Sequence, residues 1–316
     1  MTVNKKIALS LAVIAALSLY IILTRVKWSS DVPSLRGWEG KADEIIITHD
    51  DSTVRIFRKE GKWLVGDKGF PADGTLADEI EKRFREIVLT DLISKKGFYA
   101  RYDLTPDKCV EVIIKKRNET LRRCKIGKMG PTNRHTFVMI DERPEVYLAE
   151  GTFEQVMNKG VNDFREKEIL KVRQSDVSEF SIQYQGRTFS FAREEDKDAS
   201  KAQGEKGGAK KKEEGRWICR GMEGVSLDKE KVNSLLAALN PLRAATFSDV
   251  AKESLTGSIC TVRIKARGRE ISLMLYPKND SNLIAAVSES PYVFEVNKWS
   301  VERFFLKGLD SLKKSE

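Results

Sequence analysis

Two similar halves constrain the fold of this chain more than any other feature. The segment GKWLV at 61–65 recurs as GRWIC at 215–219, so each half carries a tryptophan in the same setting. Ten residues after the first tryptophan comes Asp73, and eleven after the second comes Asp228. An aspartate at a helix start accepts hydrogen bonds from the free amides there. Each aspartate therefore predicts the start of a helix.

An apolar face at helical spacing follows each aspartate. Side chains three and four residues apart lie on one face of a helix, which predicts two amphipathic helices. We expect Asn240 and Pro241 to stop the second helix. The apolar faces consist of Leu76, Ile80, Phe84 and Ile87 in the first half and of Val232, Leu235, Leu236 and Leu239 in the second.

The match continues as strand-like runs in the same order. A Leu-Thr pair stands five residues before Cys109 and again five before Cys260. Apolar residues then alternate with period two, but the first copy (from Val110) is one residue out of step with the second (from Cys260). A bulge or a one-residue gap must intervene, because a slip of one reverses every side chain. The expected strands are 44–48, 53–58, 110–115, 121–126 and 144–147, matched by 179–184, 188–192, 261–265, 271–275 and 291–294, with closing helices near 153–156 and 299–305.

Each half is therefore predicted as strand–strand–strand–helix–strand–strand–strand–strand–helix. Hairpins dominate, which indicates an α+β class with two similar, mainly antiparallel-sheet domains and about two helices in each. We place the domains at 42–170 and 171–310, with a tail at 311–316. Residues 193–216 carry many charges and no large apolar side chain until Trp217, so we expect a disordered insertion at a hairpin tip.

An uncharged apolar run extends over seventeen residues from Ile7 to Leu23, with basic residues on both sides. A helix of this length rises about 26 Å, close to the thickness of a bilayer core. We predict a transmembrane helix at 7–26, a tail at 1–6 and a polar linker at 27–41. A cleaved signal peptide is the alternative, but the run lacks a small-residue cleavage site. A buried core helix would normally show a polar stripe.

The orientation of this span does not follow from charge, because the basic residues on its two sides nearly balance. Long domains are translocated largely regardless of their charge. We therefore expect a cytoplasmic N-terminus, a single pass through the cytoplasmic (inner) membrane, and the bulk of the chain outside the cytoplasm, in the periplasm.

The net charge of +9 comes from 56 basic and 47 acidic residues that are interspersed along the chain. A nucleic-acid binder would gather its basic residues with aromatic ones between them, so we expect no nucleic-acid partner. A solvated surface of mixed charge is the preferred interpretation. Attraction to anionic lipid or to a wall polymer is the alternative.

Metal and cofactor sites find no support in the sequence. The four cysteines form no C-x-x-C pair, and the chain has only two histidines, His49 and His135. Cys109 and Cys124 lie on the two arms of one expected hairpin, in diagonal positions. Buried free thiols are favoured there over a disulfide. We predict no metal, no cofactor and no metal ligands.

No catalytic motif is present either, and we predict no catalytic residues. The acidic pairs at 43–44 and 50–51 lack the spacing of a calcium loop, and both histidines are expected in structural or surface positions. The glycine-rich segment at 127–131 is interpreted as a turn. Trp63 and Trp217 stand out by side chain, but equivalent placement in both halves favours packing in the core.

The motifs together resemble the bacterial domain of unknown function 4340 family. They are the Gly-Lys/Arg-Trp segments, the Asp-capped helices, LTP at 104–106, KIGK at 125–128, VYL at 146–148 and the Asp-Phe-Arg-x-Lys element at 163–167. The resemblance covers roughly 40–310 and is better in the first half. It implies an envelope protein, often encoded beside transporter components that resemble the gliding-motility export system. The family has no established catalytic residues.

We therefore expect a non-enzymatic, membrane-anchored extracytoplasmic protein that binds or scaffolds a protein partner in the envelope. The family resemblance makes components of an ABC-type transport or export system the implied partners. A module that binds cell-wall polymer or anionic lipid is the alternative, and a hydrolase with a dispersed site is the third.

Overall fold

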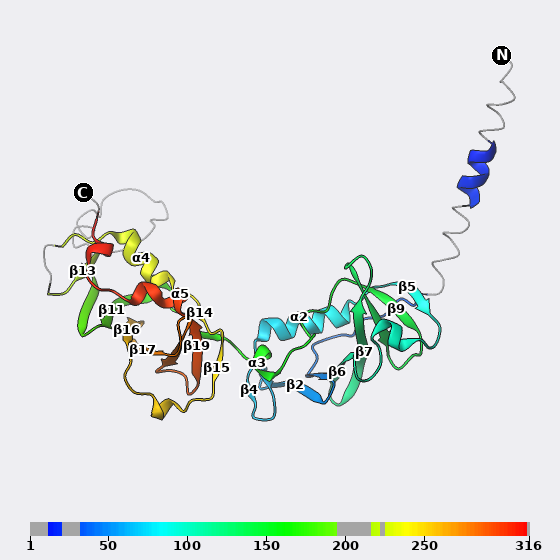
Figure 1. The fold of residues 1–316 in the computed structure, drawn as a ribbon, viewed down its shortest axis with the longest axis horizontal. Helices are drawn as coiled ribbons and strands as arrows, with labels where there is room; N and C mark the ends of the chain where they lie inside the picture. The colour runs from blue at the N-terminus through cyan, green and yellow to red at the C-terminus, as the bar shows by residue number, and fades with distance from the viewer. Residues whose placement is uncertain (1–11, 21–31, 195–215, 222–224, 315–316) are drawn as a thin grey trace, which may run out of the picture. The chain divides into compact units, whose positions relative to one another are not determined.

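The computed structural model describes residues 12–20, 32–194, 216–221 and 225–314, and the chain forms two compact units, Met1–Arg165 and Glu166–Glu316 (Figure 1). We call them the first and the second unit. The boundary lies five residues before the expected end of the first domain at 170, because Ile169 and Leu170 pack in the core of the second unit.

The first unit is built on a nine-stranded antiparallel sheet in the order β4-β3-β2-β1-β6-β7-β8-β9-β5. Helix α2 packs on one face of this sheet, and a short helix, α3, closes the unit. The elements are β1 (Glu44–His49), β2 (Ser52–Lys59), β3 (Lys62–Val65), β4 (Phe70–Pro71), α2 (Gly74–Arg85), β5 (Leu89–Ser94), the 3-10 helix η1 (Tyr99–Tyr102), β6 (Val110–Lys116), β7 (Glu119–Met129), β8 (His135–Ile140), β9 (Val146–Glu150) and α3 (Val161–Phe164).

The second unit has an eight-stranded sheet in the order β13-β12-β11-β16-β17-β18-β19-β15, and a small two-stranded sheet of β10 and β14. Its elements are β10 (Glu168–Leu170), η2 (Gln174–Asp176), β11 (Val177–Tyr184), β12 (Arg187–Glu194), β13 (Arg216–Cys219), α4 (Lys229–Ala237), β14 (Leu242–Arg243), β15 (Thr246–Ser248), η4 (Lys252–Ser254), β16 (Cys260–Ala266), β17 (Arg269–Pro277), β18 (Asn282–Val287), β19 (Val293–Asn297), α5 (Lys298–Val301), η5 (Glu302–Phe304) and η6 (Asp310–Leu312).

The two units have the same topology. Strands β3, β2, β1, β6, β7, β8, β9 and β5 of the first occupy the positions of β13, β12, β11, β16, β17, β18, β19 and β15 of the second, and β4 is an addition at one edge. The expectation of mainly antiparallel sheets with few helices is confirmed. The sequence did not indicate β5, which pairs with β9, or β15, which pairs with β19. β15 is very short, and the pairing of β5 shifts register twice, so neither shows a clear alternation.

Both predicted aspartate caps are present, and each also closes its unit. The Asp73 carboxylate accepts from the amides of Thr75 and Leu76, 3.1 Å away in both cases, and the Asp73 amide donates to the Phe164 carbonyl at 2.8 Å. In the second unit the Asp228 carboxylate accepts from the first turn of α4, and its amide donates to the Leu312 carbonyl at 2.8 Å. In each unit the same aspartate thus caps the start of the helix and forms a backbone hydrogen bond to the end of the unit.

The one-residue offset between the halves lies in the loop before the strand. Cys260 begins β16 opposite Tyr184, and Val110 begins β6 opposite His49. Val110 is therefore the counterpart of Cys260, and both lie in the main core of their unit. Cys109 precedes the strand and packs in a smaller apolar cluster. All four cysteines are buried free thiols, which confirms the prediction made for Cys109 and Cys124.

Several local expectations were wrong. Residues 153–156 are irregular, and the closing helix of the first unit comes later, at α3. Phe153 and Val156 are buried, so their spacing reflects packing of an irregular segment. The turn expected at 127–131 begins only at Gly130, because β7 runs to Met129. The expected tail from 311 includes the buried Leu312, so it belongs to the second unit.

The insertion expected at 193–216 falls almost entirely on residues outside the described part of the chain. Its two flanks are described: β12 ends at Glu194 and β13 begins at Arg216, and these two residues pair in an antiparallel arrangement. The segment therefore connects the arms of a hairpin, as predicted.

The N-terminal apolar run is described only at residues 12–20, which are helical; the rest of the expected 7–26 span lies outside the described residues. Within the described part of the chain, no helix combines the length and the apolar character needed to cross a membrane.

Residues 32–41, expected to form part of a polar linker, pack on the first unit without regular structure. Leu35 and Trp38 contact its core. The carbonyl of Arg36 accepts from Arg122 at 2.8 Å, and that of Gly40 accepts from Arg85 at 2.9 Å. The chain is therefore fixed to the first unit well before β1 begins.

A buried carboxylate completes this attachment. Glu81 of α2 is 3% exposed, accepts from the Ala42 amide at 2.9 Å and contacts the guanidinium groups of Arg58 and Arg85. A buried charge requires such partners, because it would otherwise be strongly destabilising. Leu236 occupies the equivalent position of α4 in the second unit, eight residues after its cap, so this network is specific to the first unit.

Replacing Asp73 or Asp228 by alanine is expected to cost about 1 kcal/mol of unfolding free energy in the unit concerned. Amide hydrogen exchange of α2 or α4 should then be about fivefold faster, with the other unit unchanged. Asp67→Ala, at an exposed position in the turn before β4, is the matched control. Equal acceleration in both units would show that the caps do not act within single units.

The buried cysteines should react slowly with thiolate-directed reagents. Burial raises the pKa of the Cys260 thiol to about 12, and it also raises the pKa of the Cys124 thiol. Because the reactive thiolate falls tenfold for each unit by which the pKa rises, Cys260 should be modified at pH 8 about a thousandfold more slowly than in the urea-unfolded chain. Mass spectrometry of alkylated peptides measures this. Similar rates in the two states would contradict the burial.

Candidate functional site

Each of the two histidines makes one side-chain contact in the described part of the chain. Nδ1 of His49 lies 3.4 Å from the carbonyl oxygen of Cys109. Nδ1 of His135 lies 3.5 Å from the hydroxyl of Thr132, in the turn between β7 and β8. The second contact joins a hydroxyl and an imidazole, but the hydrogen bonds of the structure give this pair no third group to orient the ring, as a nucleophile–base pair requires. Within residues 12–20, 32–194, 216–221 and 225–314, no cluster of three metal-ligating side chains occurs.

The two conspicuous tryptophans are core residues, as predicted. Trp63 and Trp217 are 5% and 2% exposed. The indole N–H of Trp63 donates to Asp78 of α2 at 2.7 Å, and that of Trp217 donates to Asn233 of α4 at 3.2 Å. An arginine stacks on each ring from the neighbouring strand, with its Cζ 4.0 Å from the Trp63 centroid and 5.0 Å from the Trp217 centroid. These contacts join sheet to helix and are structural.

The acidic pair at 43–44 is also used within the fold. The Asp43 carboxylate accepts from the Arg117 amide at 2.7 Å, and Glu44 forms ion pairs with Arg55 and Lys115. Both carboxylates of this pair therefore have a basic or amide partner within the sheet. The pair at 50–51 is exposed in the turn between β1 and β2.

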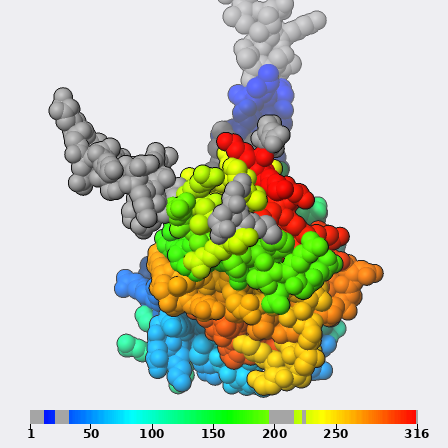
Figure 2. Space-filling model, turned by 90° about the vertical axis from the view of Figure 1, so that its left-hand side faces the viewer, coloured from blue at the N-terminus to red at the C-terminus, as the bar shows by residue number. Residues whose placement is uncertain are grey.

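A surface groove of about 920 Å³ lies in the second unit, between α4 and the C-terminal segment 302–312. Both elements are exposed at the surface in Figure 2, where α4 is yellow-green and the C-terminal segment is red. Its lining residues are Glu230, Lys231, Ser234, Leu235, Glu302, Arg303, Phe305, Leu306, Lys307, Gly308, Asp310, Ser311 and Leu312.

Hydrogen bonds to backbone carbonyls hold the walls of this groove. Arg303 donates to the Ser234 carbonyl of α4 at 2.7 Å, and Lys231 of α4 donates to the Lys313 carbonyl at 2.8 Å. From the sheet, Arg187 donates to the Lys307 carbonyl at 2.7 Å. The groove is therefore fixed on both sides before any ligand binds.

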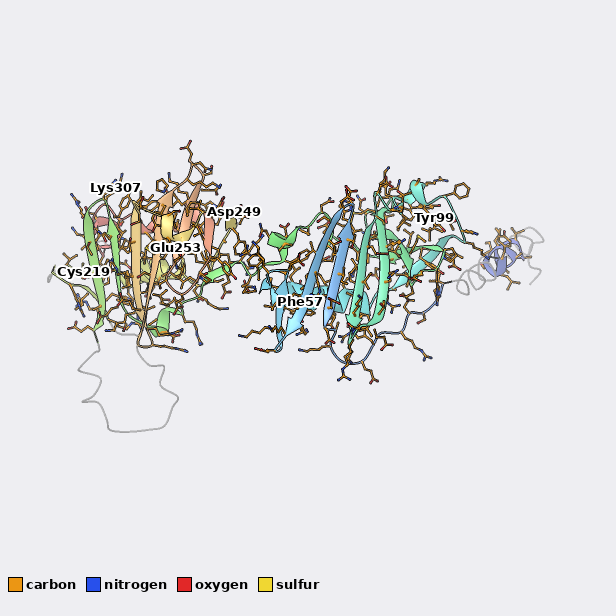
Figure 3. All side chains as sticks on the ribbon, turned by 90° about the horizontal axis from the view of Figure 1, so that it is seen from below. Phe57, Tyr99, Cys219, Asp249, Glu253 and Lys307 are labelled. Carbon is orange, nitrogen blue, oxygen red and sulfur yellow. The ribbon has the colours of Figure 1, made fainter. Side chains whose placement is uncertain are left out.

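The groove combines an apolar base with a charged rim. Leu235, Leu306 and Leu312 are buried at its base, and Phe305 is half-buried and stacks on Tyr184 with 5.0 Å between centroids. Three acidic and three basic side chains surround this base. Those at the rim are exposed to water; Lys307 is labelled in Figure 3. Lys313 lowers the pKa of the fully exposed Asp310 by hydrogen bonding and by its charge.

The groove was not predicted from the sequence. Its signal is the run ERFFLKGLD at 302–310, in which charged residues alternate with apolar ones. The same pattern is typical of helices on the surface of a domain, so it does not predict a groove. Only the tertiary structure shows that the run lies beside α4 and is shaped by contacts to it.

The sheet faces opposite the helices differ between the units. In the first unit this face carries apolar, half-buried side chains, one of which, Phe57, is labelled in Figure 3. The strand pairings show that small or polar residues occupy most of the matching positions of the second unit. The matched residues are Ile46, Phe57, Leu64 and Ile113 in the first unit and Ser181, Ala192, Ile218 and Arg263 in the second.

A sequence model of the family described as "Domain of unknown function (DUF4340)" matches residues 63–257, from the first core tryptophan to the loop before β16. No match to the chain was found among curated proteins or among solved structures.

Arg303→Gln is expected to loosen one wall of the groove. It removes a hydrogen bond between a charged, exposed donor and the Ser234 carbonyl, with a cost of about 1 kcal/mol. Amide exchange in 302–312 should become about fivefold faster. Lys265→Gln, at an exposed position on β16, is the control. If exchange in 302–312 is unchanged, the hydrogen bond of Arg303 does not contribute to holding the C-terminal segment.

Proposed function

This chain belongs to the DUF4340 family, and we propose that it is a non-enzymatic, membrane-anchored envelope protein whose second unit binds a protein partner. The groove between α4 and 302–312 carries the proposal. Its volume, apolar base and balanced charges suit a peptide segment of mixed charge with an apolar side chain.

The lack of a catalytic constellation among the described residues of the groove supports binding as its role. Its acidic and basic side chains are surface groups on a helix and on an extended segment, and they point to charge complementarity with a partner. Burial of Phe305 by an apolar residue of the partner would add a central contact, in the way that aromatic residues dominate many interfaces.

The N-terminal apolar run supports the membrane anchor in the proposal. It is long enough to span a bilayer core, and residues 12–20 are helical. Attachment of residues 32–41 to the first unit would keep that unit close to the membrane. A location outside the cytoplasm, and a partner among ABC-type transporter components, follow from the family resemblance.

Site-specific photo-crosslinking in membranes of the native host tests this function. A photoreactive residue placed at Lys307 in the full-length chain should give a discrete crosslinked product. The double substitution Glu302→Lys and Glu230→Lys, which makes the groove strongly basic, should reduce the yield at least tenfold, because it removes charge complementarity. The products are identified by mass spectrometry.

The matched control places the photoreactive residue at Glu253, which is exposed in η4 of the same unit and is labelled in Figure 3. This position should not give the product obtained from Lys307. The same product from both positions, or a product insensitive to the two charge reversals, would reject the groove as the partner site.

A further inference from the structure

The loop between β5 and η1 of the first unit exposes a large aromatic side chain. Its sequence at 95–101 is KKGFYAR. Phe98 is 77% exposed, the highest exposure among the large apolar side chains of the described residues. Ile93, near the end of β5, is also exposed. Single exposed apolar residues are common, so exposure alone does not indicate a function.

The backbone of Phe98 makes this exposure unusual. Its φ is +59°, in the left-handed region that bulky L-residues rarely adopt. Such strain persists only where the surrounding structure fixes the conformation, and it is enriched at functional positions. A glycine or asparagine would relieve the strain at an exposed loop tip, but the chain has phenylalanine there.

The base of the loop is fixed to the sheet. The Tyr99 hydroxyl donates to the Pro144 carbonyl at 3.1 Å, and the Tyr102 ring packs on Phe137 with 4.8 Å between centroids. Gly127 makes this approach possible, because a Cβ there would lie only 2.1 Å from the Tyr102 carbonyl oxygen. The loop therefore holds its tip outward on a rigid base.

The tip is basic as well as aromatic. Lys95, Lys96 and Arg101 are all exposed, and 95–101 contains no acidic residue. Two acidic residues of the nearby hairpin between β8 and β9 are paired: Asp141 with Arg122 at 2.7 Å and Glu142 with Arg123 at 2.6 Å. The segment 95–101 itself therefore carries three basic side chains and no acidic one.

The loop lies at the end of the first unit where the N-terminal segment joins it. Arg122 donates to the Arg36 carbonyl and pairs with Asp141, and Asp141 and Pro144 belong to the same turn between β8 and β9. Tyr99, which is next to Phe98 and is labelled in Figure 3, donates a hydrogen bond to the Pro144 carbonyl of this turn. The turn therefore contacts both the loop and, through Arg122, the N-terminal segment.

The chain between the apolar run and the first unit is short. From Leu23 to Val32 it can extend about 31 Å at most. An anchor formed by this run therefore keeps this end of the first unit near the bilayer.

We propose that loop 95–101 docks on an anionic membrane surface, with the Phe98 ring in the lipid interface and Lys95, Lys96 and Arg101 near lipid phosphates. An aromatic ring favours the interface, and basic residues are attracted to anionic lipid. The inference rests on the proposed membrane anchor. It assigns a role to the strained tip that packing of the fold does not explain.

The test uses the full-length chain reconstituted in nanodiscs with or without anionic phosphatidylglycerol. An environment-sensitive fluorophore is attached to Phe98→Cys, and its quenching by doxyl-labelled lipids is measured. The four native cysteines are buried free thiols, so the introduced cysteine is labelled selectively. Val88→Cys is the matched control, since Val88 is 52% exposed and lies at the other end of β5 from the loop.

In discs with phosphatidylglycerol, quenching at position 98 should exceed that at position 88 at least threefold. It should fall at least twofold in discs without anionic lipid, and also when Lys95, Lys96 and Arg101 are replaced by glutamine.

Equal, weak quenching at the two positions in incorporated chains would overturn the inference and leave the anchor intact. Protection from aqueous quenchers without lipid quenching would also overturn it, and would indicate a protein surface instead. A chain that does not co-elute with the discs would overturn the anchor and the inference with it.

Discussion

Each unit of the protein depends on one aspartate at the start of its main helix. The carboxylate accepts hydrogen bonds from amides of the first turn, and the backbone amide of the same residue donates to the carbonyl of the last buried apolar residue described in the unit, Phe164 or Leu312. Buried backbone groups at helix ends destabilise a fold when they lack hydrogen-bond partners. In each unit, one aspartate provides such partners both at the start of the main helix and at the end of the unit. The helix then covers the sheet, and its Asp78 or Asn233 accepts the indole N–H of the core tryptophan.

The two units share this framework but differ in the groups attached to it. The first has buried Glu81, which binds the backbone before β1, whereas Leu236 fills that position in the second. The first has Gly127, which lets the η1 loop approach the sheet, whereas the strand pairings place Tyr276 there in the second. The first unit thus carries the attached segment 32–41 and the η1 loop, and the second unit carries the groove.

These differences divide the proposed roles between the units. The first unit has the fixed N-terminal segment and the basic, aromatic tip, which suit a position at the membrane. The second has the groove, whose walls are fixed by hydrogen bonds to carbonyls and whose base is apolar. A partner bound by the second unit would then be recruited to the membrane through the first. The division follows from a few side chains, since the backbone topology of the units is the same.

The repeat, the helix caps, the hairpins, the mainly antiparallel class and the burial of the two tryptophans could all be predicted from the sequence. These features depend on neighbours in the chain or on period-two and helical spacing, which a single sequence displays. The positions of β5 and β15, the packing of 32–41, the groove and the setting of Phe98 emerge only in the folded chain. Each of these requires contacts between residues far apart in the sequence, such as Arg122 with Arg36, Arg303 with Ser234 and Tyr99 with Pro144. The spacing of residues along the chain does not predict such pairs, because many different partners could form the same contact with a given side chain.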